Sequence, residues 1–207
     1  MLNLNEEQII SRLLKAPLEL PEADEPDFSA ILPGEPRPAA VLIPLLRKDG
    51  EWHLLLTRRN SELPEHSGQV AFPGGRADPE DHSPEDTALR EAYEEIGLAP
   101  RDVRILGCLR KFHTITNYLV TPVVGLIPWP YRLRLATEEV SRAFTIPLAW
   151  LADPSNREIQ KRELPPPYKT VTVIYFRPYD GEILWGASAR FTLSLLDIFT
   201  NNGSGSN

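Results

Sequence analysis

The chain has 207 residues, of which 42% are hydrophobic and 25% charged, and a net charge of -7. This balance is typical of one globular domain with its own core, and it excludes a disordered or a fibrous protein. A negative chain lacks the broad basic face with which proteins bind nucleic acid backbones, so we expect no nucleic acid partner. A small anionic substrate remains compatible with this charge if cations gather locally.

Cys108 is the single cysteine of the chain, so it cannot form an internal disulfide and favours a reducing compartment. Its neighbours Leu106 and Leu109 are apolar, so we expect a buried, unreactive thiol. No stretch approaches the ~18 apolar residues that cross a bilayer, and the amino terminus lacks the charged-then-apolar order of a secretory signal. The sequence therefore predicts a cytoplasmic protein with no membrane contact.

The amino-terminal part predicts a helix followed by an extended arm. Apolar residues recur at helical spacing within residues 5–16, which indicates a short amphipathic helix. Residues 17–38 are rich in proline and acid and form the predicted arm. We therefore divide the chain into this segment, residues 1–38, one domain over residues 39–200, and a flexible tail over residues 201–207.

The domain begins with a predicted hairpin, because Asp49 and Gly50 give a strong turn signal between apolar runs at residues 39–46 and 52–57. Further apolar runs predict strands at residues 70–72, 103–112, 118–128, 170–178 and 181–186, the last two as a pair.

Prolines lie within two of the later predicted elements and modify the prediction for each. Pro122 indicates an edge position or a bulge for its strand. A helix is predicted from Thr137 to Asp153 with an interruption at Pro147, and a final helix over residues 187–200. Strands and helices mix without regular alternation, so the predicted fold class is α+β, an α/β/α sandwich built on a mixed sheet.

A further helix is predicted between Ser83 and Gly97, where serine is a good cap, Pro84 suits the first turn and glycine ends the helix. On a helical wheel the apolar residues gather on one side: Leu89, Ala92, Tyr93 and Ile96. Three glutamates fall within about 100° on the opposite side: Glu91, Glu94 and Glu95. We expect the helix to bury the apolar face and to present three carboxylates from the other.

The crowded carboxylates favour a metal site. Each like-charged pair at ~6 Å costs about 3 kcal/mol at an effective dielectric of ~20, and Arg90 offsets only part of this through Glu94, four residues on. The remaining charge suits Mg²⁺ or Mn²⁺, which prefer oxygen ligands. A solvated acidic face is the alternative. The turn that includes Gly74 and Gly75 favours the metal, since glycine lets backbone groups approach a ligand closely.

Residues 75–98 resemble the Nudix box, usually written G-x5-E-x7-R-E-U-x-E-E-x-G-U with U apolar. Its second half matches without a gap at Arg90, Glu91, Ala92, Glu94, Glu95, Gly97 and Leu98. The first half departs, because the loop is one residue longer. The box glutamate falls on Asp81 when counted forward from Gly75, and on His82 when counted back from Arg90.

Residues 55–75 resemble the additional motif of the coenzyme A pyrophosphatase branch, L-L-T-x-R-[SA]-x3-R-x3-G-x3-F-P-G-G. The matching residues are Leu55, Leu56, Thr57, Arg59, Gly68, Phe72, Pro73, Gly74 and Gly75. Two positions differ: Asn60 stands where a small residue is usual, and Pro64 stands where the motif has a second arginine.

The resemblance implies a Nudix-like mixed sheet flanked by helices, and an enzyme in which water attacks a pyrophosphate with the help of Mg²⁺ or Mn²⁺. For coenzyme A the products would be 4′-phosphopantetheine and 3′,5′-ADP. The implied metal ligands are Glu91, Glu94, Glu95 and the carbonyl of Gly75, with Arg90 orienting the glutamates.

The resemblance leaves the general base open between Glu138 and Glu139, and Glu139 stands in the glutamate-valine position of the branch. We therefore expect Glu94, Glu139 and Arg90 to be catalytic. The expected substrate-binding residues are Arg58, Arg59, His66, Gly74 and Gly75. His113 is expected to be structural.

Other functions remain open. One alternative is the same enzyme class acting on ADP-ribose, NADH or an oxidised nucleotide. The departures from the coenzyme A motif at Asn60 and Pro64 leave this alternative open. A non-catalytic nucleotide-binding module is disfavoured, because the glutamate trio is complete. The oligomeric state is also open, with a homodimer formed through the arm as one hypothesis.

Overall fold

The computed structural model describes residues 4–15, 32, 34–62, 68–163 and 170–200. The helices are α1 (Glu6–Lys15), α2 (Pro84–Ile96), α3 (Leu148–Ala152) and α4 (Gly186–Thr200), with short 3-10 turns η2 (Pro100–Asp102) and η3 (Pro154–Asn156). The strands are β1 (Arg37–Lys48), β2 (Glu51–Arg59), β3 (Val70–Ala71), β4 (Gly74–Arg76), β5 (Arg104–Cys108), β6 (Phe112–His113), β7 (Tyr118–Leu126), β8 (Val140–Pro147), β9 (Arg157–Glu163) and β10 (Thr170–Phe176).

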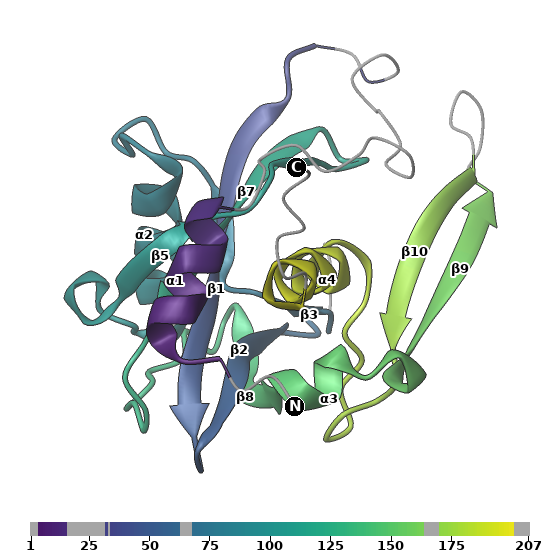
Figure 1. The fold of residues 1–207 in the computed structure, drawn as a ribbon. Coiled ribbons are helices and arrows are strands. Elements are labelled where there is room, and N and C mark those ends of the chain that lie inside the picture. Colours follow the sequence, from purple (N-terminus) through teal and green to yellow (C-terminus); the bar gives the residue numbers. More distant parts are fainter. Residues whose placement is uncertain (1–3, 16–31, 33, 63–67, 164–169, 201–207) are drawn as a thin grey trace.

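A mixed eight-stranded sheet forms the centre of the molecule, with α2 on one face and α1 and α4 on the other (Figure 1). Its main path runs β3-β2-β1-β7-β5; β4 pairs with β1, β6 with β7, and β8 with β2. The pair β1 and β7 is parallel, and the other pairs are antiparallel. The α+β class with helices on both faces of a mixed sheet is therefore confirmed.

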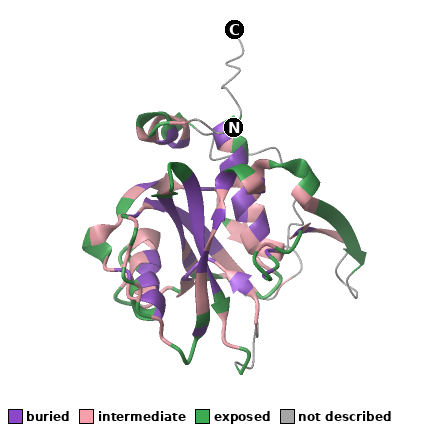
Figure 2. Ribbon diagram, turned by 90° about the horizontal axis from the view of Figure 1, so that it is seen from below, coloured by how far each residue is buried: buried purple, intermediate pink, exposed green. Residues whose placement is uncertain are grey.

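Two apolar clusters cover the two faces of the sheet, because successive side chains of a strand point to opposite sides. On β1, Leu42 packs in the cluster that includes Ala92 of α2. Its neighbour Ile43 packs in the cluster of α1 and α4, which includes Phe199. Figure 2 shows buried residues concentrated in the central strands. This packing fixes the position of α2 on one face of the sheet.

The structure confirms the predicted hairpin and three predicted helices, and the residues that caused each prediction have the expected conformation. The β1–β2 hairpin turns at Asp49 and Gly50, whose φ angles are 51° and 83°, and Lys48 pairs with Glu51. Such a two-residue turn needs positive φ at both positions, which asparagine, aspartate and glycine tolerate best. The helices α1, α2 and α4 also form where the sequence predicts them.

The helix predicted from Thr137 is wrong for most of its length. Residues 137–139 form a turn, Val140–Pro147 is strand β8, and only Leu148–Ala152 is helical. Phe144 and Ile146 are buried at alternate positions of β8, opposite Leu56 and Leu54 of β2. Pairing with a buried strand overrides the helical pattern here.

Pro122 does not mark an edge strand, because β7 lies between β1 and β5. The predicted strand 103–112 is split into β5 and β6, and Pro122 lies opposite the interruption between them. There its carbonyl accepts a bond from the Leu109 amide. Neither β5 nor β6 pairs with Pro122, so no strand partner there requires the amide hydrogen that proline lacks.

The strand pair predicted between residues 170–178 and 181–186 forms in part: the Phe176 amide donates to the Leu184 carbonyl at 2.8 Å, but the main partner of residues 170–176 is another strand. Strand β10 pairs with β9, and residues 181–186 contribute only the isolated bridges of Tyr179 with Glu182 and of Tyr175 with Trp185. Six of the seven residues of β9 are exposed, so the sequence carries no apolar pattern there. The β9–β10 hairpin stands at the side of the molecule (Figure 1).

Two further predictions concern termini and membranes. The predicted tail at residues 201–207 lies outside the described residues, as does the predicted arm apart from residues 32 and 34–38. Among the helices that the structure describes, none has the length and apolarity needed to cross a bilayer.

Candidate active site

Helix α2 starts and ends where its sequence predicts, and this fixes the position of its glutamates. The Ser83 hydroxyl accepts a bond from the Asp86 amide at 3.1 Å, and Pro84 occupies the first turn. Gly97 ends the helix with φ at 69°, and its amide bonds back to the Tyr93 carbonyl. These caps stabilise both ends of the helix, each typically by about 1 kcal/mol.

Strand β4 lies directly against α2 because it consists of glycines at the point of contact. A Cβ atom on Gly75 would lie 2.5 Å from Oε1 of Glu91, and one on Gly74 would lie 2.4 Å from the carbonyl oxygen of Ala40. A side chain does not fit at Gly74, where backbone atoms block it, and at Gly75 it fits only if the Glu91 carboxylate moves. The glycine pair therefore brings backbone atoms of β4 next to the acidic side of the helix.

The three glutamates have different environments, which corrects the predicted wheel. The exposed fraction of the side chain is 16% for Glu91, 56% for Glu94 and only 4% for Glu95. Tyr93, expected on the buried face, is 57% exposed. The helix packs against β1 and also against β4, so its buried side is rotated toward Glu95 relative to the apolar stripe.

Burial raises the pKa of Glu95 to about 8, and the nearby charges of Glu91 and Glu139 act in the same direction. The guanidinium of Arg59, with Nη1 3.8 Å from Oε1, and the amide of Gly74 oppose this. Desolvation without enough positive charge always disfavours a carboxylate. Glu95 is thus a buried acid that lacks full charge compensation.

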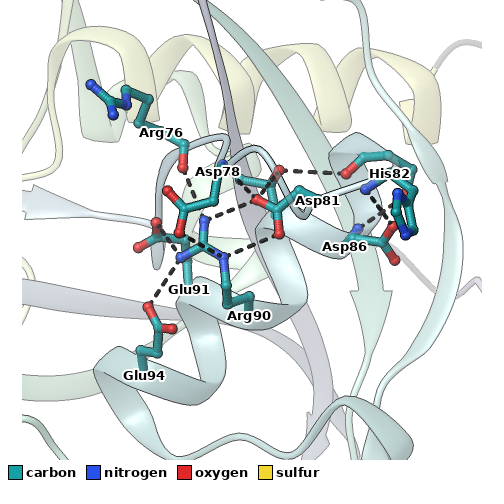
Figure 3. A network of polar contacts seen from close by, with 10 residues as sticks. Arg76, Asp78, Asp81, His82, Asp86, Arg90, Glu91 and Glu94 are labelled. Carbon is teal, nitrogen blue, oxygen red and sulfur yellow. Dashed lines mark hydrogen bonds and ion pairs between the residues drawn. The ribbon is translucent and has the colours of Figure 1, made fainter.

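Arg90 connects the loop before the helix to two of the glutamates (Figure 3). Its Nη1 donates to Glu91 at 3.0 Å and to Glu94 at 3.1 Å. Its Nη2 donates to the carbonyl oxygen of Arg76 at 3.0 Å, and Nε and Nη2 donate to the two oxygens of Asp81 at 3.1 and 3.0 Å. Every donor group of this guanidinium is therefore directed at an oxygen of β4, of the loop or of the helix.

Asp81, rather than His82, takes the position of the box glutamate. Its side chain is 7% exposed and also accepts bonds from the Thr87 hydroxyl and the Asp78 amide, each at 2.9 Å. The bond from Arg90 contributes most to lowering the pKa of Asp81 to about 2. His82 is exposed, and its backbone amide bonds to Asp86 at the helix start. The extra residue of the loop is accommodated at the helix start.

Glu139 lies in the turn before β8, where its charge raises the pKa of both Glu91 and Glu95. The backbone amide of Asn60 donates to the Glu139 carbonyl at 2.7 Å, and the Asn60 side chain donates to the Thr137 carbonyl at 2.9 Å. Sequence reasoning treated Asn60 only as a departure from a motif. In the fold it positions the turn that carries the predicted base.

Two arginines predicted to bind substrate point to opposite sides of β2. Arg59 faces Glu95 on the α2 side, whereas Arg58 makes an ion pair with Glu182 at 3.5 Å. The structure thus brings Arg59, and not Arg58, to the glutamates. His113 bonds to Asn117 through its Nε2 atom at 2.9 Å. His66 and Pro64 lie outside the described residues.

Cys108 is half-buried rather than fully buried, and its thiol donates to Oε1 of Glu85 at 3.3 Å. Burial, followed by the Glu85 carboxylate, raises the pKa of this thiol to about 12. The thiolate is the reactive form, so this environment agrees with the unreactive thiol that the sequence predicts.

The chemistry of the expected ligands fits a hard divalent ion, since Glu91, Glu94, Glu95 and the Gly75 carbonyl all offer oxygen atoms. The buried Glu95 also needs positive charge. In the part of the chain that the structure describes, no three acidic, histidine or cysteine side chains converge at ligand distances. Arg90 instead holds Glu91 and Glu94 in ion pairs.

A cavity of about 620 Å³ opens beside the loop before α2. Three cationic side chains line it, from β1, β4 and the segment before β6: Arg37, Arg76 and Lys111. Asp78 and Asp81 line it as well, and Asp81 is neutralised by Arg90. Sequence reasoning missed these cations, because they are far apart in the chain and no spacing connects them.

Comparison with known proteins identifies the family. Residues 36–166 match the NUDIX domain. A relative from Photorhabdus laumondii, called uncharacterized Nudix hydrolase NudL, is 41% identical over 161 residues, covering 74% of this chain and 80% of the relative. The chain belongs to the Nudix hydrolase family. A NudL from Escherichia coli K12 is 49% identical over 113 residues, which are 55% of this Nudix hydrolase and 58% of the relative.

Solved Nudix structures are more distant. An Ap4A hydrolase from C. elegans is 20% identical, with a TM-score of 0.46 over 55% of this chain and 81% of that chain. The NUDIX domain of NrtR from Shewanella oneidensis, solved with ADP-ribose, is 22% identical, with a TM-score of 0.42 over 59% of this chain and 82% of that chain. Similarities at this level do not bear on substrate.

Proposed function

We propose that this Nudix hydrolase cleaves the pyrophosphate bond of coenzyme A or its derivatives, giving 4′-phosphopantetheine and 3′,5′-ADP. The observation that carries the proposal is the pair of acids that α2 turns toward β4: Glu95 is buried, and Glu91 is partly buried against Gly75. Such a site needs a cation to offset its charge, and coenzyme A hydrolysis needs one to offset the charge of its phosphates.

A divalent ion, Mg²⁺ or Mn²⁺, would be held by Glu91, Glu94, Glu95 and the carbonyl of Gly75. When bound, it would supply charge neutralisation at the phosphate oxygens and activation of water. Arg90 contacts one carboxylate oxygen of Glu91 and one of Glu94, which leaves the other oxygen of each for the ion. Arg90, fixed by Asp81, then keeps the α2 glutamates oriented toward β4.

Glu139 is proposed as the general base. It accepts a proton from the attacking water, whose oxygen forms a bond to phosphorus while the bridging phosphorus–oxygen bond breaks. Its charge already acts on Glu91 and Glu95, so it lies on the acidic side of α2. Arg59, whose Nη1 lies 3.8 Å from Oε1 of Glu95, is proposed to bind a phosphate oxygen.

The cavity lined by Arg37, Arg76 and Lys111 favours coenzyme A over substrates that carry only the two phosphates of a pyrophosphate. Coenzyme A carries a 3′-phosphate in addition to its pyrophosphate, and Arg76 follows the proposed ligand Gly75 directly in β4. The cavity reaches Ser83, eight residues before Glu91 and so roughly 12 Å away along the helix. This separation leaves room for the ribose that carries both phosphate groups of coenzyme A.

A second candidate keeps the reaction and changes the substrate to ADP-ribose or NADH. The observation in its favour is Pro64, which replaces the second arginine of the coenzyme A motif. A Nudix module that binds a nucleotide without hydrolysis is disfavoured by the complete set of glutamates. We further propose that residues 39–200 form one catalytic domain and that the protein is cytoplasmic.

The deciding experiment incubates the purified chain with each candidate substrate and Mg²⁺ or Mn²⁺, and separates the products by chromatography. We expect metal-dependent release of 3′,5′-ADP from coenzyme A, and loss of this activity in Glu95→Gln with the fold unchanged by circular dichroism. Glu138→Gln is the matched control and should keep its activity. Turnover of Glu95→Gln at the wild-type rate would refute the assignment.

The cavity is tested separately with coenzyme A and its analogue without the 3′-phosphate. We expect Arg76→Ala and Lys111→Ala to raise KM for coenzyme A about tenfold while KM for the analogue stays unchanged. Arg101→Ala, an exposed cation outside the cavity, serves as control. Equal effects on both substrates would remove this support and favour the second candidate.

A further inference from the structure

Strand β9 presents an open edge on the side opposite its partner. In the described part of the chain it pairs only with β10, in a two-stranded sheet. It is the outermost strand in Figure 1, and six of its seven residues are exposed. Ile159 is 63% exposed. A two-stranded hairpin is marginally stable in water by itself, and an open edge is a template for another strand.

The sequence of β9, REIQKRE, has charges that complement each other about its centre. If two copies of β9 run antiparallel with Gln160 opposite Gln160, Arg157 faces Glu163 and Glu158 faces Arg162. Ile159 then lies beside the aliphatic part of Lys161 of the second copy. Each opposite-charge pair occurs twice because of the two-fold symmetry.

Symmetry and charge together select this register. Residues directly opposite in a sheet share a face, so a two-fold symmetric pair must be centred on one residue. Centring on Ile159 places Arg157 opposite Lys161, and centring on Lys161 places two lysines opposite each other. Both arrangements bring like charges together, which is destabilising in a sheet. Centring on Gln160 avoids every like-charged pair.

The charged side chains of β9 bond to uncharged groups: Arg157 donates to the Leu151 carbonyl at 3.3 Å, and Glu158 accepts from the side-chain amide of Gln160. Among the described residues none of them makes an ion pair. Arg162 lies over the ring of Tyr175, which stacks on Trp185 with the ring planes 3° apart. The hairpin is therefore anchored on the β10 side by the stacking of Tyr175 on Trp185 before α4, and no described residue pairs with the outer edge of β9.

We propose that β9 pairs antiparallel with β9 of a second copy of this chain, centred on Gln160, to form a four-stranded sheet across a two-fold axis. Backbone hydrogen bonds along the edge supply the attraction, since exposed ion pairs contribute little each. The charges fix the register and exclude other strands.

The first test is the oligomeric state of the full chain, measured by analytical ultracentrifugation over a concentration series at low salt. We expect a dimer for the wild type and, for Glu158→Lys, a dissociation constant raised at least tenfold, because the introduced ammonium group then faces Arg162. The combined change Glu158→Lys and Arg162→Glu restores opposite charges and should restore the dimer. Glu7→Lys, an exposed charge reversal on α1, should leave it unchanged. A wild-type monomer at all concentrations, or a dimer indifferent to Glu158→Lys, overturns the proposal.

The second test concerns the register. Only the proposed pairing places residue 160 opposite itself, within reach of a disulfide bond. With diamide as oxidant, Gln160→Cys should form a covalent dimer at a rate at least tenfold above that of Lys161→Cys and of the wild type. Faster cross-linking of Lys161→Cys would overturn the register.

Discussion

Asp81 binds the guanidinium of Arg90 through both of its carboxylate oxygens, at 3.1 and 3.0 Å. This pair links the loop before α2 to the residue that contacts Glu91 and Glu94. The shorter aspartate reaches Arg90 although the loop has one residue more than the Nudix box. The arginine is held in one orientation by this contact, and so are the glutamates that it touches.

Asp81→Asn should therefore lower activity and stability together. It removes the charge that orients Arg90 and leaves a partly buried cation less compensated. We expect kcat to fall about tenfold to a hundredfold, and the free energy of unfolding at pH 7 to fall by about 2 kcal/mol. Enzyme assays and urea unfolding measure the two effects. Asp78→Asn, whose carboxylate is 46% exposed and 3.8 Å from Arg90, is the control with a smaller expected effect.

The acid stability of the protein should also depend on Asp81. Its pKa is lowered to about 2 in the folded state, from 3.8. Such a group stabilises the fold above its unfolded pKa, and this contribution disappears as the pH falls from about 4 to about 2. The shift corresponds to roughly 2 kcal/mol. Urea unfolding between pH 2 and 5 should show a smaller loss of stability in Asp81→Asn than in the wild type.

Gly75→Ala should displace the Glu91 carboxylate without removing any acidic group from the site. The added Cβ would meet Oε1 of Glu91 at 2.5 Å, so the carboxylate must move away from the Gly75 carbonyl. We expect hydrolysis to fall at least a hundredfold with only a small loss of stability, because the flexible end of the Glu91 side chain can shift. Gly50→Ala is a suitable comparison, because its Cβ meets nothing within 4 Å and only its φ of 83° is strained. Full activity in Gly75→Ala would contradict the close contact.

Glu95→Gln should stabilise the protein in the absence of metal at alkaline pH. The pKa of Glu95 is raised to about 8, so the fold loses stability as the pH rises from about 4.5 to 8, where the unfolded chain releases this proton and the folded chain keeps it. The neutral glutamine avoids this cost, on the order of 2–4 kcal/mol at pH 9 and close to zero at pH 4. Thermal unfolding with a chelator measures it. Added Mg²⁺ should raise the Tm of the wild type and not that of the variant.

Asn60→Asp should loosen the turn that carries Glu139. The new side chain has nearly the same shape but cannot donate to the Thr137 carbonyl, which Asn60 does at 2.9 Å. We expect kcat to fall several-fold with little change in KM, and stability to fall by about 1 kcal/mol. An unchanged kcat would show that the side-chain bond to this turn does not matter for hydrolysis.

The sequence alone determined the local parts of this protein. The caps of α2, the Asp49-Gly50 turn and the glutamate spacing depend on neighbours within one helical turn or one hairpin, so they can be read without a fold. The family followed from the same stretch, because its residues lie close together in the chain.

The tertiary structure decided which residues meet across the sheet. Burial of Glu95 depends on where β4 lies, and the role of Asp81 depends on how the loop folds back onto Arg90. The strand identity of residues 140–147 follows from pairing with β2. The cations Arg37, Arg76 and Lys111 come together from three segments. These relationships arise from contacts between residues far apart in the chain, and local propensity and spacing carry no information about such contacts.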